Sequence, residues 1–159
     1  MENVARILGL DVGNRRIGVA ISDELGITAQ PVLTLLRKNP RADVRSLARL
    51  VRKYNCREIV VGNPLRLTGG KSPQAEKTQK FAQWLADETK LPVHLWDERL
   101  TTVEAHRILY QAGRHRTEHR RVVDQVAAVL ILQDFLDSRG APANATYHPE
   151  SGPPSSSQV

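Results

Sequence analysis

The chain has 159 residues, which fits one domain of ordinary size, and its 40% hydrophobic content excludes a wholly disordered polypeptide. A single cysteine excludes an internal disulfide, and no apolar run approaches the ~20 residues that cross a bilayer, so we expect a cytoplasmic protein without membrane contact. The formal net charge of +6 has two interpretations, nucleic-acid binding and an ordinary solvated basic surface.

The first third of the sequence predicts antiparallel strands. Residues 6–12 and 17–22 are apolar runs around a Gly-Asn pair, a pattern typical of a hairpin. A third strand is expected over 27–36, and Pro31 restricts it to a sheet edge or a strand start because proline lacks an N–H donor.

The hydrophobic period then becomes helical. Asn39-Pro40 suits a helix start, and apolar residues follow at helical spacing through Val51. The remaining elements are expected as a strand at 58–62, a helix from Ser72, a strand at 91–96, a helix from Thr101 to Ala112 and a last helix at 118–137. The last helix is apolar almost all round, so we expect it to pack centrally.

The composition shifts after Gly140 to a stretch rich in proline and serine that lacks Leu, Ile and Phe. Such a stretch buries too little surface to offset its ordering, so we expect one domain over 1–139 and a disordered tail over 140–159. The order of elements predicts an α/β fold with a mixed five-stranded sheet flanked by helices, because hairpins pair antiparallel and helix crossovers join parallel strands.

Asp11 ends the first apolar strand, where its carboxylate is expected to be partly desolvated. A carboxylate in such a place needs a cation or hydrogen-bond donors. Cation binding and an Asx-type turn, in which Asp11 accepts from nearby backbone N–H groups, explain the residue equally well.

Two further carboxylate positions close apolar elements. Asp97 and Glu98 end the fifth strand, and only one of them can face Asp11, because adjacent strand residues point to opposite sides. The alternative for Glu98 is a surface ion pair with Arg99, which contributes little. Asp124 lies in the first turns of the last helix, where the alternative is a favourable interaction with the helix dipole.

Three carboxylates gathered by a fold repel one another unless divalent cations lie between them. Mg²⁺ prefers oxygen ligands, and two such ions about 4 Å apart can activate water and stabilise the leaving oxygen of a phosphodiester. An Asp/Glu/Asp set in a basic protein is therefore typical of phosphodiester hydrolysis.

A basic cluster lies within fifteen residues of the C-terminal half, and only Glu118 opposes it. Its members are Arg107, Arg114, His115, Arg116, His119, Arg120 and Arg121. Because only 4% of the residues are aromatic, this pattern favours contact with the phosphate backbone over base stacking.

Four segments follow one another in a specific order: LGLDVGNRRIGVA at 8–20, VVGNPL at 60–65, DERLTT at 97–102 and VDQVAA at 123–128. Together they resemble the signatures of the YqgF/RuvX family, over residues 4–139. The resemblance implies an RNase H-like fold and a nuclease of the two-metal-ion type that uses Mg²⁺ or Mn²⁺. Family members are described as Holliday-junction resolvases and as nucleases that mature the 5′ end of pre-16S rRNA.

Carried over by motif, the catalytic and metal-binding set is Asp11, Glu98 and Asp124. The expected contacts to nucleic acid, either pre-rRNA or branched DNA, are Arg15, Arg16, Asn63, Arg99, Thr101, Thr102, Arg114, Arg116 and Arg120. The sequence departs from the family pattern at Asn63, where leucine is common, and in the loop that ends at Ser72.

Two other function classes compete with the nuclease. A non-catalytic RNA-binding factor on the same fold predicts binding without metal-dependent cleavage. An actin-like ATPase also has an Asp-x-Gly hairpin, as in Asp11-Val12-Gly13, but it needs two such domains and the chain supplies one. The sequence is compatible with a monomer and with a homodimer.

Overall fold

The computed structural model of the chain describes residues 6–63, 73–97, 117–138 and 145–150. The elements in chain order are β1 (Arg6–Val12), β2 (Arg16–Ser22), β3 (Ala29–Leu36), α1 (Pro40–Tyr54), β4 (Cys56–Asn63), α2 (Pro73–Thr89), β5 (Val93–Asp97), α4 (Thr117–Asp137) and β6 (Ala145–Tyr147). The predicted helix from Thr101 to Ala112 lies outside the described residues.

The strands form one mixed sheet in the order β3-β2-β1-β4-β5-β6. β1 pairs antiparallel with β2 and β2 with β3, whereas β4 is parallel to both β1 and β5. β3 is an edge strand, as Pro31 predicted. The α/β class and the mixed sheet expected from the sequence are confirmed.

The C-terminal end corrects the sequence prediction of five strands, and of the tail predicted as disordered over 140–159 the structure describes residues 145–150. Residues Ala145–Tyr147 form a sixth strand that pairs antiparallel with β5. Tyr147 packs against the core, and Gln83 Nε2 donates a hydrogen bond of 3.1 Å to the His148 carbonyl. Composition concealed this strand because the backbone of β5 supplies its hydrogen bonds and one aromatic side chain supplies its apolar contact.

The start of α1 follows the capping signal in the sequence. The Asn39 side chain accepts a hydrogen bond of 2.9 Å from the Ala42 N–H, and Pro40 occupies the first helical position. At the other end Asn55 adopts the left-handed conformation, with φ of 55°, and its N–H caps the last turn. α1 therefore begins and ends at residues whose side chains suit those positions.

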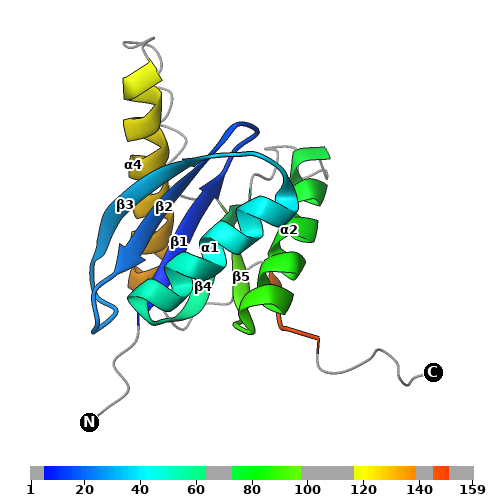
Figure 1. Ribbon diagram of the computed structural model, residues 1–159. Coiled ribbons are helices and arrows are strands. Elements are labelled where there is room, and N and C mark those ends of the chain that lie inside the picture. The colour runs from blue at the N-terminus through cyan, green and yellow to red at the C-terminus, as the bar shows by residue number, and fades with distance from the viewer. Residues whose placement is uncertain (1–5, 64–72, 98–116, 139–144, 151–159) are drawn as a thin grey trace, which may run out of the picture.

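The helices form a layer on each side of the sheet (Figure 1), with α1 and α2 on one face and α4 on the other. Alternation along β1 separates the two cores: Leu8 and Leu10 pack with α1 and α2, whereas Ile7 packs with α4. α4 contacts mainly β2, β3 and β1, so it is the central helix that its apolar sequence predicted.

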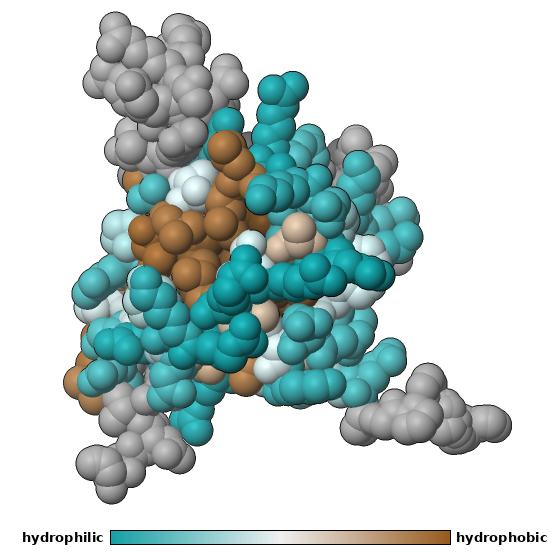
Figure 2. All heavy atoms as spheres, viewed as in Figure 1, coloured by the Kyte–Doolittle hydropathy of each residue, from teal (hydrophilic) through white to brown (hydrophobic). Residues whose placement is uncertain are grey.

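On the side of the sheet that α1 and α2 cover, hydrophilic and apolar residues occupy different parts of the molecular surface. Figure 2 shows hydrophilic atoms over the two helices and apolar atoms gathered over β2 and β3, beside α1. Leu33 and Leu35 of β3 are partly buried and pack against the core on this side. Across the described ranges, no helix has the length and apolar character needed to cross a membrane.

Candidate active site

Asp11 is placed by the register of the first hairpin. It is one of four buried polar side chains among the described residues, with 7% of its surface exposed. Alternation along β1 puts Asp11 on the face of Ile7, toward α4, and the antiparallel register sets it opposite Gly18 of β2. Directly opposite residues share a face, so Gly18 lies beside Asp11 beneath α4.

Gly18 brings α4 onto this strand pair. A Cβ atom at Gly18 would lie 2.0 Å from the carbonyl oxygen of Asp124 and 2.4 Å from its carbonyl carbon. Gly9 admits α4 in the same way, because a Cβ there would lie 2.7 Å from Cβ of Leu132. The two glycines thus seat α4 so that Asp124 lies next to the strand pair that carries Asp11.

Sequence analysis gave Gly9 and Gly18 no role, although both lie in the segment that resembles the family. The available signal was a glycine inside a buried strand, which marks a close approach of another backbone. A glycine at such a position indicates that another backbone segment lies close by, but it does not identify that segment as α4.

Arg16 holds the Asp124 side chain. Its Nε donates to Asp124 Oδ2 over 2.8 Å, and the two side chains are only 18% and 21% exposed. Gln125, the next residue, donates from Nε2 to Thr34 Oγ1 over 3.2 Å and fastens this part of α4 to the edge strand. Arg16, predicted as a substrate contact, is therefore a partner of a predicted metal ligand.

Among the described residues, Arg16 contacts one of the two oxygens of the Asp124 carboxylate. Within residues 6–63, 73–97, 117–138 and 145–150, no hydrogen bond to its Oδ1 accompanies the Arg16 bond to Oδ2. Two carboxylates, Asp11 and Asp124, thus share one part-buried region with Arg16. Oxygen donors of this kind fit a hard divalent cation such as Mg²⁺.

The described residues contain no group of three His, Cys, Asp or Glu side chains that could hold a metal ion by themselves. Glu98, the third predicted ligand, lies outside the described residues. The predicted contacts outside them are Arg99, Thr101, Thr102, Arg114 and Arg116.

Besides Arg16, three predicted substrate contacts have a described backbone position. Arg15 is exposed in the turn between β1 and β2, and its carbonyl accepts from the Arg37 N–H over 2.9 Å. Asn63 ends β4 opposite Asp97 of β5, and Arg120 lies in the first turns of α4. The structure thus brings Asp11, Arg16 and Asp124 together, while the other predicted contacts stay predictions.

β5 shows which of its residues face α4. The His94 ring stacks on Phe135 of α4 at 5.3 Å between centroids, and the Trp96 ring meets the same phenyl edge-on at 5.4 Å. Trp96 Nε1 also donates to Asp134 of α4. Residues 94 and 96 therefore define the α4 side of this strand.

A second Asp–Arg pair lies beyond the end of β3, at the start of α1. Arg37 Nε donates to Asp43 Oδ2 over 3.0 Å, and the Lys38 N–H donates to Asp43 Oδ1 over 3.0 Å. Arg37 Nη1 also donates to the Gly13 carbonyl over 2.9 Å, and its guanidinium lies over the Phe81 ring. This pair joins the β1–β2 turn to α1 and α2.

Known proteins resemble this chain over most of its length. A family model described as "RuvX: Holliday junction resolvase" matches residues 5–138. A protein of Koribacter versatilis named "Putative pre-16S rRNA nuclease" is 54% identical over 135 residues, covering 85% of this chain and 88% of that protein. A protein of Moorella thermoacetica with the same name is 53% identical over 135 residues, covering 85% and 96%.

Two solved structures share the fold at low identity. Thermus thermophilus RuvC in complex with Holliday junction substrate aligns with a TM-score of 0.55 at 12% identity, covering 87% of this chain and 98% of that one. The fowlpox virus resolvase with Holliday junction DNA aligns with a TM-score of 0.52 at 15% identity, covering 84% and 97%. These likenesses confirm the predicted RNase H-like fold, and the family match shows that the chain belongs to the RuvX family.

Proposed function

We propose that this protein is a metal-dependent nuclease that hydrolyses phosphodiester bonds in structured nucleic acid, with the 5′ end of pre-16S rRNA as its substrate. The single observation that carries the proposal is the convergence of Asp11 and Asp124 at Gly18. The relatives that are 53% and 54% identical carry the corresponding name. Family membership supports nuclease chemistry in general, and the named substrate extends it to rRNA.

The two carboxylates have the chemistry that this reaction requires. When bound, Mg²⁺ or Mn²⁺ would activate a water molecule and stabilise the leaving oxygen of the phosphodiester. Asp11 and Asp124 would hold the cation, and Arg16 orients Asp124 through Oδ2 so that Oδ1 stays available. Arg16 also offsets part of the repulsion between the carboxylates, which lowers the cost of holding both near the sheet.

Glu98 completes the proposed set in preference to Asp97. His94 and Trp96 face α4. We infer Glu98 rather than Asp97 because the same alternation, if continued past the end of β5, would give position 98 the side of α4. Asp97 has the opposite parity. A glutamate at this position would supply the third carboxylate ligand, and its longer side chain can reach across the strand ends.

Arg15 is the strongest of the predicted phosphate contacts. It is exposed in the β1–β2 turn, four residues after Asp11, and is not part of the Arg16–Asp124 pair. We assign it to the substrate phosphates together with Asn63, Arg99, Thr101, Thr102, Arg114, Arg116 and Arg120. The proposed setting is the cytoplasm, where rRNA is processed.

The test is cleavage of a labelled RNA spanning the 5′ end of 16S rRNA beside a labelled four-way DNA junction, each with Mg²⁺, Mn²⁺ or EDTA. We expect RNA cleavage that requires metal and falls at least about a hundredfold in Asp11→Asn and Asp124→Asn. Asp137→Asn is the matched control, because this exposed aspartate ends the same helix as Asp124.

Three outcomes would contradict the proposal in different ways. Cleavage that survives EDTA, or full activity of Asp11→Asn, removes the metal site. Cleavage of the junction alone assigns the substrate to branched DNA. Tight RNA binding without cleavage under any metal supports the non-catalytic RNA-binding factor. Comparison of Glu98→Gln with Asp97→Asn decides between the two neighbours.

A further inference from the structure

A pocket of about 350 Å³ opens on the face of the sheet opposite to Asp11 and Asp124. Its lining residues are Val12, Asn14, Arg37, Pro40, Lys77, Thr78, Lys80, Phe81 and Trp84. Val12 follows Asp11 directly in β1 and Asn14 lies in the β1–β2 turn, so this pocket and the candidate active site share one end of the sheet.

The wall formed by α2 combines cations with an exposed aromatic side chain. Lys80 and Phe81 each lie three or four residues from Lys77 and from Trp84, so the four residues share one side of the helix. Lys77 and Lys80 are exposed, and the salt bridges between described residues include neither of them. Trp84 is 49% exposed, which leaves much of a large apolar ring in water.

On the opposite wall of the pocket, the positive charge of Arg37 is already paired. Arg37 donates from Nε to Asp43 and from Nη1 to the Gly13 carbonyl, and its guanidinium lies 5.1 Å from the centre of the Phe81 ring. Its charge is thereby offset by a buried carboxylate. Lys77 and Lys80 are therefore the cations of this pocket that remain for a ligand.

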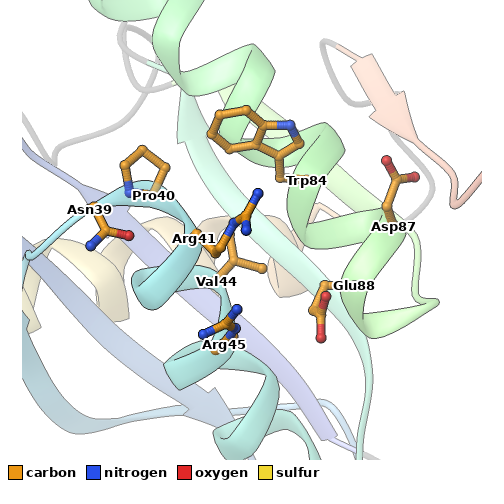
Figure 3. Close-up of a pocket in the computed structure, with 8 residues that line it drawn as sticks. All are labelled: Asn39, Pro40, Arg41, Val44, Arg45, Trp84, Asp87 and Glu88. Carbon is orange, nitrogen blue, oxygen red and sulfur yellow. The ribbon is translucent and has the colours of Figure 1, made fainter.

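Trp84 also borders a second pocket of about 600 Å³ between α1 and α2. Figure 3 shows the indole across from Pro40 and Arg41 of α1, with Asp87 and Glu88 further along α2. Arg41 and Arg45 of α1 line this second pocket together with Asp87 and Glu88, so the formal charges of its described lining residues balance. Among the described residues, the lining of the smaller pocket holds Lys77 and Lys80 and no carboxylate, so a negatively charged strand in contact with Trp84 is attracted toward these lysines and the β1–β2 turn.

We propose that the pocket beside Trp84 binds an unpaired nucleotide of the nucleic-acid substrate, with the base stacked on the indole and the flanking phosphates on Lys77 and Lys80. Stacking on aromatic rings tolerates every base, and phosphates bind amines in the same way whatever the sequence. The site therefore selects single-stranded over duplex nucleic acid, because paired bases have their faces already stacked.

This inference rests on the proposed function and deepens it. A strand that is cut at Asp11 and Asp124 would continue over the β1–β2 turn and enter the pocket on the other face. The protein would then require a single-stranded segment next to the bond that it cuts. Sequence analysis missed this site because the low aromatic content argued against base stacking, whereas one exposed tryptophan suffices.

The first experiment measures binding alone, in EDTA, so that cleavage does not enter. Single-stranded RNA and DNA oligonucleotides of one sequence, and the matching duplexes, are titrated into the full chain while tryptophan fluorescence is recorded. Trp84→Leu and the double variant Lys77→Gln/Lys80→Gln are compared with wild type. Lys53→Gln is the matched control, because this exposed lysine of α1 borders neither pocket.

We expect single strands to quench the fluorescence of wild type but not of Trp84→Leu, in which Trp96 is the remaining tryptophan. Trp84→Leu should bind single strands about tenfold more weakly, and each lost lysine should lower the salt slope by about 0.7. If RNA and DNA oligonucleotides bind alike, the site recognises the base and the phosphates. If RNA binds more tightly than DNA, the site also recognises the ribose.

Unchanged single-strand affinity and quenching in Trp84→Leu would overturn the pocket, as would duplex binding that depends equally on Trp84. If wild type shows no metal-dependent cleavage but its binding of single strands still depends on Trp84, the proposed nuclease function is rejected and the binding pocket is retained. In cleavage assays Trp84→Leu should raise KM for substrates with a single-stranded flank and leave kcat unchanged.

Discussion

The two Asp–Arg pairs among the described residues differ in how many carboxylate oxygens are bound. In the pair at the start of α1, both oxygens of Asp43 accept hydrogen bonds, from Arg37 and from the Lys38 N–H, and the carboxylate is 5% exposed. In the pair under α4, Arg16 binds Oδ2 of Asp124, and no described residue donates to its Oδ1. A carboxylate with both oxygens bound serves structure, whereas a carboxylate with an available oxygen can bind a ligand.

The packing of the two faces differs in the same sense. The face under α1 and α2 is filled by large aliphatic side chains such as Leu8, Leu10 and Leu47, all at 0% exposure. The face under α4 depends on the absence of side chains at Gly9 and Gly18. Both faces bury apolar volume, since Ile131 and Leu132 of α4 are also at 0% exposure, and the α4 face in addition requires this close approach of helix and strand.

The largest effect should come from adding one methyl group under α4. Gly18→Ala places a Cβ atom 2.0 Å from a backbone oxygen of Asp124, so helix and strand must separate. We expect a loss of about 4 kcal/mol or more, or a chain that does not fold. The reverse change on the other face, Leu10→Ala, should cost about 2–5 kcal/mol by leaving a cavity.

Urea unfolding of both variants measures this comparison, with Gly13→Ala as the milder control because its Cβ would meet only the Arg16 carbonyl, at 3.1 Å. A Gly18→Ala protein as stable as wild type would show that α4 does not approach β2 as described.

The next largest effect is a difference in the stability that is lost when each of the two ion pairs is broken. Asp43→Asn leaves the Arg37 charge part-buried without its partner, and we expect a loss of about 3 kcal/mol. Asp124→Asn breaks a more exposed pair that also lies beside the Asp11 carboxylate, so a loss of about 1 kcal/mol is expected in EDTA. Equal losses in thermal or urea unfolding would remove the distinction between a structural and a ligand-binding pair.

A smaller effect concerns the chemical reactivity of the buried thiol of Cys56. Burial at the start of β4 raises the pKa of its thiol to about 12, so the thiolate that reacts with alkylating reagents is scarce at pH 8. We expect slow labelling of the native protein and rapid labelling in urea. Fast stoichiometric labelling of the native chain would contradict this account of β4.

The smallest effect concerns the exposed turn between β2 and β3. Hydrogen bonds from the Thr28 and Ile27 N–H groups lower the pKa of Asp23 below 3.8, so the ionised form is favoured in the folded state. Its stabilisation is complete above the unfolded-state pKa and is lost as the pH falls through the lower, folded-state pKa. The melting temperatures of wild type and Asp23→Asn should therefore converge in acid, and a difference that grows in acid would reverse the sign.

Much of the fold could be predicted from the sequence because local signals agreed with the tertiary structure. The hairpin of β1 and β2, the edge position required by Pro31 and the Asn39 cap of α1 are all confirmed. β6 was not predicted, because its hydrogen bonds come from β5 and leave little trace in its own composition.

The site could be predicted only in part. Asp11 and Asp124 stand out as carboxylates in apolar elements, but their convergence depends on glycine positions whose neighbour is fixed by tertiary packing. The pairing of Arg16 with Asp124 was missed for the same reason, since 108 residues separate them in the chain. Glu98 and most of the predicted basic contacts stay predictions.

A cation site between the sheet and α4 is tested most directly by the binding of Mn²⁺ to wild type, Asp11→Asn, Asp124→Asn and Asp43→Asn, at a temperature where all four are folded. We expect Asp43→Asn to bind Mn²⁺ like wild type, and Asp11→Asn and Asp124→Asn each to bind at least about tenfold more weakly. Equal affinity in wild type, Asp11→Asn and Asp124→Asn would contradict a cation site between the sheet and α4.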